Sequence, residues 1–392
     1  MGRPNDILIP PDTSWLNDPA ARKLCQAMGD AGFQILFVGG CVRNALLGLA
    51  DSDIDMSTNA LPDQVSAIAE NAGFKAIPTG IDHGTITVVV DGAGFEVTTF
   101  RRDVATDGRR AVVAFSHSIE DDARRRDFTM NALYADIGGN VFDPLGGVQD
   151  LLARRVKFIE DPDARIKEDY LRILRFFRFS AWYADAHNGF DAIALAAIST
   201  NTDGLETLSA ERVGQEMWKL LAAPDPSKAL ATMRQVNVLA TIMPGADDRM
   251  IGVLVHMEDV LGLSPDPVSR LTLLGGDDPT QKLRLSKNQS RALAVLKEAA
   301  FEGPSIAEIA YRHGEQTARA VVAIRATIAE VEPEFGQLKT ISSAAAAKFP
   351  VAASDLMPNY AGAALGLKLK ELEQRWIESH FRLTAAELLD NG

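Results

Sequence analysis

The sequence predicts an α/β domain at the N-terminal side and an all-helical remainder. From residue 31 to about residue 142, short β-branched runs alternate with helical stretches, a pattern typical of a mixed α/β domain. After the turn at residues 144–147 the pattern changes, and from residue 163 onward nearly every segment has helical period. We therefore expect a globular head followed by a long helical part.

Four regions follow from these changes of pattern. We expect an N-terminal extension at residues 1–30, a head at 31–145, a helical neck at 146–245, and a helical body and tail at 246–392. The head should contain several short strands, each rich in β-branched or aromatic residues. The expected strands are residues 33–38, 53–56, 85–90, 95–100, 111–114 and 132–136.

Two aspartates stand one residue apart at Asp53 and Asp55. Side chains two positions apart on a strand project from one face, so both carboxylates can reach the same cation. Mg²⁺ prefers one or two carboxylates together with phosphate oxygens and waters. The pair therefore indicates a metal site, although a solvated turn is the ordinary meaning of such a short motif.

A glycine pair precedes these aspartates. Phe33 to Val38 is an apolar run that predicts a buried strand, Gly39 and Gly40 form a turn, and Val42 to Leu47 predicts the start of a helix. A triphosphate at this turn would meet free N–H groups and the positive end of a helix dipole. The alternative is that the glycines serve only to pack a strand against a helix.

Composition predicts a soluble cytoplasmic protein with no membrane partner. At 392 residues and 46% hydrophobic the chain can bury a sizeable core. It has no run of ~18 apolar residues and no secretory signal pattern at the N-terminus. Its two cysteines, Cys25 and Cys41, are too few for a disulfide framework and agree with a reducing compartment.

The net charge of −13 argues against a nucleic-acid partner at first sight. Residues 101–178, however, hold 15 Lys and Arg against 14 Asp and Glu, so the acidity lies elsewhere. Several acids in this segment are expected to bind a metal or a base, which leaves the arginine clusters available to bind a polyanion. The alternative is that these clusters are solvated surface. The clusters are Arg101-Arg102, Arg109-Arg110, Arg124-Arg125-Arg126 and Arg154-Arg155.

A helix is predicted over residues 161–181. Apolar residues recur there at steps of three and four and form one stripe, made of Ile166, Tyr170, Ile173, Phe177 and Ala181.

Polar side chains are expected beside that stripe. Asp169 and Arg172 are three apart, so they are expected to be neighbours on the helix surface, with Arg165 on the same side. An exposed ion pair of this kind contributes only about 0–1 kcal/mol, and such a pair is the plain alternative to a functional one.

Several further runs occur in a fixed order along the chain. They are PTGIDHGT at 78–85, EVTTFR at 96–101, RRDFTMNA at 125–132, EDYLRILR at 168–175 and SAERV at 209–213. Together with residues 39–58 they resemble the family of class II tRNA nucleotidyltransferases (CCA-adding enzymes) and bacterial poly(A) polymerases. The resemblance is strong through roughly residues 31–245 and fades beyond.

The resemblance implies a head with the polymerase-β-like nucleotidyltransferase fold and an all-α neck, body and tail. It implies template-independent addition of C, C and A to tRNA 3′ ends from CTP and ATP, by two-metal nucleotidyl transfer that releases pyrophosphate. Mg²⁺ would be the cofactor and tRNA the partner, bound by the body and tail. We expect a monomer or a homodimer.

The resemblance also implies roles for individual residues. Asp53 and Asp55 look like the metal ligands, and Glu96 like a third catalytic carboxylate. Glu211 and Arg212 resemble a supporting motif, residues 103–118 resemble the flexible loop of CCA-adding members, and Asn44 stands where the family usually has Asp. The residues that resemble the nucleotide-binding set are Gly39, Gly40, Arg43, Arg126, Asp127, Asn131, Asp169, Arg172, Arg175 and Arg178.

The side chains of Asp169 and Arg172 would select which nucleotide base is bound. A carboxylate at Asp169 can accept from an exocyclic amine, and Arg172 can donate to ring acceptors. These groups match the edges of cytosine and adenine and suit uracil and guanine poorly. The protein itself would then act as the template.

Three other functions are weighed against CCA addition. An A-adding enzyme or poly(A) polymerase shares the same motifs, but poly(A) polymerases usually carry a more basic stretch where this chain reads LLGLADSDID. A catalytically inactive RNA-binding protein would not need the carboxylates or the base-reading pair. A metal phosphohydrolase would need clustered histidines, and the six here are scattered; His83, inside a matched run, is the one to follow.

Overall fold

The computed structural model describes residues 7–50, 53–107, 110–185, 187–301, 303–333 and 336–390. It forms two compact units. The first contains the residues up to Glu216 together with Gln235–Ile242, and the second contains Met217–Arg234 and the residues from Met243 onward.

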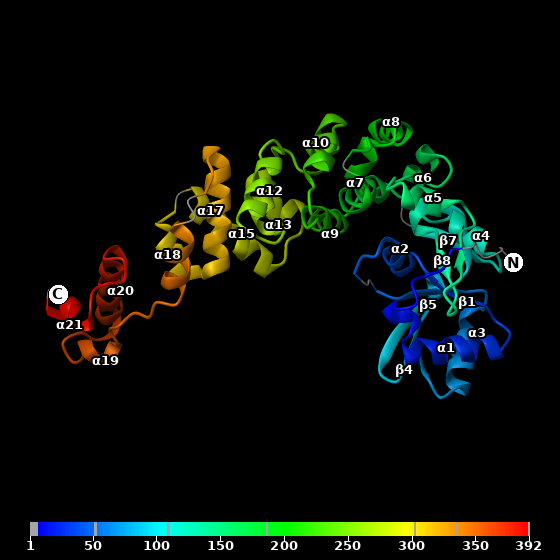
Figure 1. Ribbon diagram of the computed structural model, residues 1–392, viewed down its shortest axis with the longest axis horizontal. Helices are drawn as coiled ribbons and strands as arrows, with labels where there is room; N and C mark the ends of the chain where they lie inside the picture. The colour runs from blue at the N-terminus through cyan, green and yellow to red at the C-terminus, as the bar shows by residue number, and fades with distance from the viewer. Residues whose placement is uncertain are drawn as a thin grey trace. The chain divides into compact units, whose positions relative to one another are not determined.

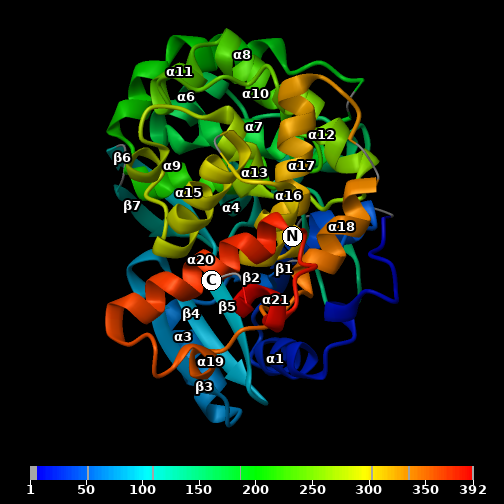
Figure 2. The same cartoon turned by 90° about the vertical axis from the view of Figure 1, so that its left-hand side faces the viewer.

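The first unit is built on a mixed sheet. Its seven strands are β1 (Ile35–Val38), β2 (Asp55–Thr58), β3 (Lys75–Gly80), β4 (Thr85–Val90), β5 (Ala93–Thr99), β8 (Tyr134–Ala135) and β9 (Val141–Phe142). Their order is β3-β4-β5-β2-β1-β8-β9, in which β2 and β5 are parallel and the other neighbours antiparallel. A separate hairpin consists of β6 (Arg101–Asp107) and β7 (Arg110–Phe115), and Figure 2 shows it apart from the sheet.

The predicted α/β head is confirmed, with strand ends that differ from those expected. Strands β3, β6 and β9 were not predicted. β3 has no buried residue to give an apolar alternation, and β9 is only two residues long. Strand β2 begins at Asp55, so Asp53 lies in the loop before the strand and not on it.

Helices surround this sheet. In the first unit they are η1 (Ser14–Leu16), α1 (Pro19–Asp30), α2 (Gly40–Leu47), α3 (Pro62–Asn71), η2 (Ile81–His83), α4 (Ile119–Arg124), η3 (Thr129–Asn131), α5 (Gly147–Leu152), α6 (Pro162–Glu168), α7 (Leu171–Tyr183), α8 (Ala192–Thr200), η4 (Thr202–Thr207) and α11 (Val238–Ile242). Helices α1 and α3 lie side by side against the sheet (Figure 1).

Residues 7–30 form part of this core. Trp15 packs on Phe37 with ring centroids 4.3 Å apart, and Leu24 and Met28 are fully buried. Burial of these large side chains stabilises the unit by roughly 2 kcal/mol each. The bounds of the four predicted regions stay predictions.

The helix predicted over 161–181 is wrong in one respect, because α6 and α7 are separate helices. Asp169 has extended backbone (φ −155°, ψ 106°), and its Oδ1 accepts the N–H of Leu171 at 3.1 Å. Side chains of Asp commonly compete with the helix in this way. Tyr170 packs tightly on Gly204, where a Cβ would lie 2.1 Å from the ring. The break therefore serves tertiary packing.

The second unit is helical, as predicted. Its helices are α10 (Ser227–Gln235), α12 (Ile251–Val260), α13 (Pro267–Leu274), α14 (Pro279–Lys282), α15 (Lys287–Phe301), α16 (Ile306–His313), α17 (Glu315–Ala329), α18 (Gly336–Ala345), α19 (Ala353–Leu356), α20 (Gly362–Glu378) and α21 (Ala385–Asp390), and the boundary between the units falls within α9 (Ala210–Leu221). Every helix in the described ranges falls short of what a membrane crossing requires.

Candidate active site

Two of the three predicted catalytic carboxylates, Asp55 and Glu96, lie on neighbouring strands at the middle of the sheet. Asp55 on β2 stands opposite Glu96 on the parallel strand β5, and Asp53 precedes Asp55 by two residues. Partial desolvation and the charges of Glu96 and Asp53 raise the pKa of Asp55, while Arg126 opposes this. Carboxylates that repel one another in this way favour a cation between them.

The donor set fits Mg²⁺ better than a metal held by the protein alone. Among the described residues no three His, Cys, Asp or Glu side chains surround one point, so Glu96 does not complete a preformed cage with the aspartates. Mg²⁺ is usually bound by one or two carboxylates plus substrate phosphates and waters. Asp53 and Asp55 supply the right number and type of protein ligand.

The glycine turn lies beside these carboxylates in the sheet order. Gly39 has φ 73° and ψ −115°, which only glycine adopts readily, and α2 begins at the next residue. Its N–H donates to the Leu133 carbonyl at 3.1 Å. A Cβ at Gly39 would lie 3.6 Å from Nη1 of Arg126, so that guanidinium sits at the turn.

Arg43 is buried beneath the turn and is only 6% exposed. Its Nη1 donates to Asn131 Oδ1 at 2.5 Å and its Nη2 to the Tyr183 hydroxyl at 2.8 Å, while the guanidinium lies 4.1 Å from the centroid of the Tyr183 ring. Most of its donors thus bind the protein. Arg43 supports the turn, and its predicted role in nucleotide binding stays a prediction.

Asn44 gives the turn a second support. Its Oδ1 accepts from Nε and Nη2 of Arg43 at 3.2 and 2.9 Å, and its Nδ2 donates to the Ala50 carbonyl at 2.9 Å. A carboxylate could accept from Arg43 but could not donate to Ala50. The asparagine therefore ties α2 to the start of the loop that leads to Asp53.

A chain of charged side chains joins η3, α7 and α9. Asp127 accepts from Asn131 Nδ2 at 3.0 Å and from Arg175 Nε at 2.6 Å. Burial would raise the pKa of Asp127, but Arg175 and Asn131 outweigh it and hold the pKa below its ordinary value. Beyond Arg175, Glu216 accepts from Arg178 Nε at 2.5 Å. Five of the predicted residues are therefore brought together here, Arg43, Asp127, Asn131, Arg175 and Arg178.

Sequence reasoning missed three members of this site, Glu216, Tyr183 and Asp122. Glu216 and Tyr183 carry no local pattern that would reveal them. Asp122 is fully buried and binds Arg125, Arg126 and the Tyr134 hydroxyl at 2.7 to 3.0 Å. Its only mark in the sequence is its nearness to the arginine run.

The side chains of Asp169 and Arg172 do not bind each other. Arg172 donates to Glu168 at 2.5 Å and to the carbonyls of Arg165 and Arg125 at 2.9 Å. Asp169 instead accepts from Arg212 Nη2 at 2.7 Å. The ion pair between these two side chains, which was the alternative to a functional pair, is therefore not formed, because the helix break turns Asp169 toward α9. The base-reading role of the two residues stays a prediction.

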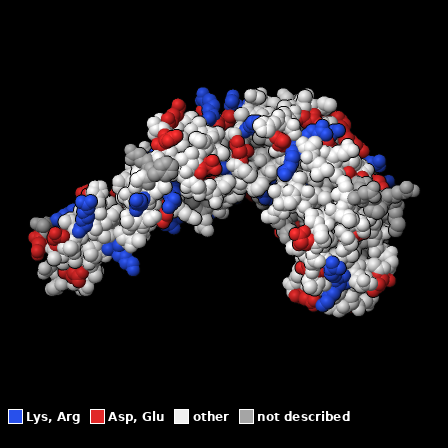
Figure 3. All heavy atoms as spheres, viewed as in Figure 1, with Lys and Arg blue, Asp and Glu red and all other residues white. Residues whose placement is uncertain are grey.

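The arginine clusters are largely paired with acids. Arg124 pairs with Glu160, Arg155 with Asp150, and Arg125 and Arg126 with Asp122. On the face drawn in Figure 3, basic and acidic side chains are interspersed. The cluster Arg124–Arg126 and Arg155 are therefore paired with acids, while Arg109 lies outside the described residues.

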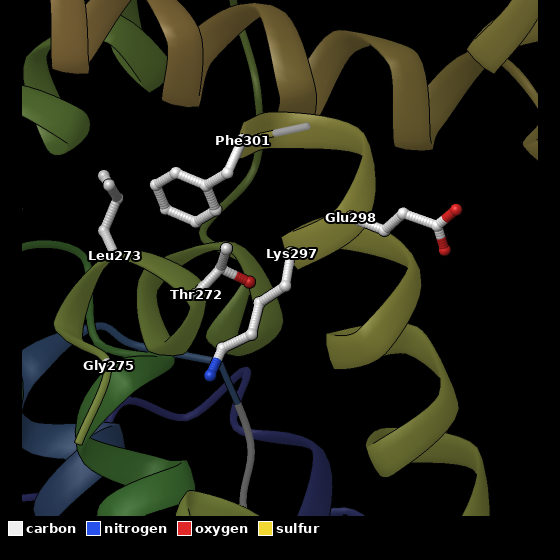
Figure 4. Close-up of a pocket in the computed structure, with 6 residues that line it drawn as sticks. All are labelled: Thr272, Leu273, Gly275, Lys297, Glu298 and Phe301. Carbon is white, nitrogen blue, oxygen red and sulfur yellow. The ribbon is translucent and has the colours of Figure 1, made fainter. Parts of the chain in front are cut away.

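The second unit contains a hollow. It has a volume of about 600 Å³ between α13 and α15 and is lined by Thr272, Leu273, Gly275, Lys297, Glu298 and Phe301. Figure 4 shows the Glu298 carboxylate directed away from Lys297. None of the predicted site residues lines it.

Family models and related proteins match most of this chain. Residues 35–157 match the family described as "Poly A polymerase head domain", and residues 191–250 match "Probable RNA and SrmB- binding site of polymerase A". The chain is 31% identical to the CCA tRNA nucleotidyltransferase 1, mitochondrial, of Mus musculus, covering 97% of this chain and 91% of the mouse protein. It is 40% identical to the CCA-adding enzyme of Geobacillus thermodenitrificans over 56% of this chain and 52% of that protein.

Two solved structures are similar over nearly the whole chain. The Bacillus stearothermophilus CCA-adding enzyme in complex with CTP has a TM-score of 0.69 and 27% identity, covering 92% of this chain and 94% of that one. The Thermotoga maritima CCA-adding enzyme complexed with tRNA has a TM-score of 0.68 and 17% identity, covering 98% of each chain, which shows the shared fold.

Proposed function

Because this chain belongs to the family of CCA tRNA nucleotidyltransferases and bacterial poly(A) polymerases, we propose that it adds C, C and A to tRNA 3′ ends from CTP and ATP and releases pyrophosphate. The observation that carries the proposal is the placement of Asp55 opposite Glu96, with Asp53 and the Gly39 turn nearby. The relative whose structure holds CTP supports it.

The chain's own residues position the reactants. Asp53 and Asp55 would hold Mg²⁺, which when bound supplies neutralisation of phosphate charge and activation of the attacking tRNA hydroxyl. The N–H groups at the start of α2 and the guanidinium of Arg126 would meet the triphosphate oxygens. Phosphoryl transfer asks for such positioning more than for a side-chain base.

Base selection would depend on Asp169 and the two arginines near it. The carboxylate can accept from the exocyclic amine of cytosine or adenine. Arg212 already binds Asp169 and holds it in place, whereas Arg172 would have to leave Glu168 to meet the base. Arg212 is therefore part of the base-reading group in this proposal.

We propose that the helical body and tail bind tRNA. The Thermotoga maritima structure, described as complexed with tRNA, has the same fold as this chain. The cytoplasmic location and the monomeric or dimeric state expected from the sequence stay predictions; the mouse relative is named mitochondrial.

The test is to incubate purified protein and Mg²⁺ with three tRNAs, one lacking the 3′ CCA, one ending in C and one ending in CC. CTP, ATP, UTP and GTP are supplied singly and in pairs, and products are resolved at single-nucleotide length. Addition of two C residues and then one A supports the proposal. Addition of A alone identifies an A-adding enzyme, and long A tails identify a poly(A) polymerase; either outcome refutes CCA addition.

A further inference from the structure

Three polar side chains hold the guanidinium of Arg126. Its Nε donates to the Tyr134 hydroxyl at 3.2 Å. Its Nη2 donates to Oδ2 of Asp122 at 3.0 Å and to the Ser57 hydroxyl at 3.4 Å. These partners come from β8, α4 and β2, so three separate elements of the first unit fix the direction of one side chain.

Asp122 and Tyr134 form a buried pair next to that guanidinium. Both side chains are fully buried, and the Tyr134 hydroxyl donates to Oδ2 of Asp122 at 2.7 Å. Burial raises the pKa of Tyr134, so the phenol keeps its proton for this bond and accepts from Arg126 with its oxygen. The guanidinium also lies 5.4 Å from the centroid of the Tyr134 ring. A buried polar network in which every member has a partner holds its members in one arrangement.

The contacts of Nε and Nη2 leave Nη1 of Arg126 for a ligand. In the part of the chain that the structure describes, Nη1 has no protein acceptor, and a Cβ at Gly39 would lie 3.6 Å from it. The network is built into the same strands as this turn, because Tyr134 on β8 pairs with Val38 on β1, the residue before Gly39. Nη1 is therefore held at the glycine turn by the strands that form the turn.

The sheet order indicates which phosphate Nη1 would meet. The predicted catalytic carboxylates lie on or beside β2 and β5, whereas the glycine turn follows β1, on the side of β2 away from β5. The α-phosphate has to lie at the carboxylates, because it holds the phosphorus that the tRNA hydroxyl attacks. The turn and Arg126 are then left for the β- and γ-phosphates, which depart as pyrophosphate.

We propose that Tyr134 and Asp122 are positioning residues for the triphosphate, because they fix Arg126 so that its Nη1 donates to the β- or γ-phosphate. The inference rests on the proposed function. Bonds between a guanidinium and a phosphate are strong and depend on direction, and a side chain that is already fixed loses little freedom on binding. Because Tyr134 and Asp122 are fully buried, neither would touch the nucleotide, and both act through Arg126.

Four variants test the proposal. Tyr134→Phe removes the hydroxyl and keeps the ring, Asp122→Asn removes the charge and keeps the shape, and Arg126→Ala removes the proposed ligand. The fourth is the double variant that combines Tyr134→Phe with Arg126→Ala. Tyr311→Phe is the matched control, because it also loses a hydroxyl bond of 2.7 Å, to Glu373 in the second unit.

Binding is measured by calorimetry at a temperature where each variant is folded, with two probes in the presence of Mg²⁺. Inorganic tripolyphosphate carries only phosphates, and CMP carries the base, the ribose and one phosphate. The KM for CTP in C addition to tRNA lacking CCA is measured as well. A variant that only loosens the fold should weaken both probes alike, whereas loss of a positioning residue should weaken tripolyphosphate alone.

Tyr134→Phe and Asp122→Asn should each weaken tripolyphosphate binding about tenfold, the size of one hydrogen bond to a charged group, and raise the KM for CTP by a similar factor. CMP binding should stay within about twofold of the parent, and Tyr311→Phe should behave as the parent with both probes. In the Arg126→Ala background, Tyr134→Phe should cause no further loss, because the effects of two residues that act through one contact do not add.

Parental tripolyphosphate binding in either Tyr134→Phe or Asp122→Asn overturns the proposal, as does equal weakening of tripolyphosphate and CMP. A further tenfold loss when Tyr134→Phe is added to Arg126→Ala would show that Tyr134 does not act through the guanidinium, and it overturns the proposal as well. If the parent adds no nucleotide, the proposed function fails, while tripolyphosphate binding to parent and variants still decides the positioning role.

Discussion

Arg212 donates from Nη2 to Oδ2 of Asp169 at 2.7 Å. The other carboxylate oxygen accepts the N–H of Leu171 at 3.1 Å, so both oxygens have protein partners. The two residues come from α9 and from the break between α6 and α7. A carboxylate held from two sides presents its remaining lone pairs in one direction, as reading of a base edge requires.

Replacing Arg212 with Ala should weaken discrimination between CTP and UTP. Asp169 would lose one partner and turn more freely, and for a pair about one-third exposed we expect a loss of roughly fivefold in the ratio of kcat/KM values. Steady-state kinetics with each nucleotide measure it. Arg249→Ala, which breaks an exposed ion pair with Asp247, is the control and should keep the parental ratio.

Asp53→Ala and Asp55→Ala should each lower nucleotide addition at least about 10³-fold, because a bound metal contributes several kcal/mol of charge stabilisation. The melting temperature should change little, since neither side chain is buried in the core. Asp91→Ala, an exposed aspartate of the same domain, should keep its activity. Addition within a few-fold of the parent in either variant would contradict the metal assignment.

Metal removal gives an independent check on that assignment. EDTA should abolish addition, and excess Mg²⁺ should restore it, because the described residues form no cluster of three or more His, Cys, Asp or Glu side chains that could hold the ion without substrate and water. Activity that persists in EDTA would rule out a dissociable Mg²⁺ at this site.

Shortening the hairpin should separate the two additions. Residues 104–112 are replaced by two glycines. The variant keeps the residues at which the hairpin joins the rest of the chain, which are Phe100, Arg101, Phe115 and Ser116. C addition should remain measurable, and most A addition to tRNA ending in CC should be lost, since residues 103–118 resemble the flexible loop of CCA-adding members and we expect that loop to reshape the base pocket before A is added. A loss shared equally by both steps would show that the hairpin serves general binding.

Asp122→Asn should destabilise the protein most at neutral pH. Burial alone would raise the pKa of Asp122, but Arg126 and Arg125 outweigh it and lower the pKa to about 2. A carboxyl with a lowered pKa stabilises the fold above its unfolded pKa near 4, by roughly 2 kcal/mol here, and the contribution is lost as pH falls toward 2. The difference in melting temperature between parent and variant should therefore shrink to about half between pH 7 and pH 3, whereas Asp259→Asn, an exposed substitution, should follow the parent throughout.

The main features of the fold were predictable from local sequence. The run before Gly39 forms β1, the residues after Asp55 form β2, and the part beyond residue 163 is helical. These features depend on hydrophobic period and on glycine conformation, which neighbouring residues determine. Even so, β3 was missed because its side chains are half exposed and show no alternation.

The sequence yielded a list of candidate site residues, whose functional roles stay predictions, but not the contacts among them. The order of motifs along the chain identified Asp127, Asn131, Arg175 and Arg178, and the structure brings them together. Glu216, which binds Arg178 from 38 residues away, carries no mark in the sequence. Its contact requires α9 to lie beside α7, and no local sequence pattern predicts which helices lie side by side.

The binding partner of Asp169 was not predictable from the local sequence. The residue types and spacing predicted a carboxylate with Arg172 as its neighbour on one helix surface, and an ion pair between the two was the alternative to a functional role. The structure pairs Asp169 with Arg212, 43 residues away, because the helix breaks at Asp169 and Tyr170 packs on Gly204. A surface pair on one helix contributes less than about 1 kcal/mol, whereas burying an aromatic ring contributes about 2 kcal/mol or more. Packing therefore decides which arginine Asp169 binds, and only the folded chain contains that information.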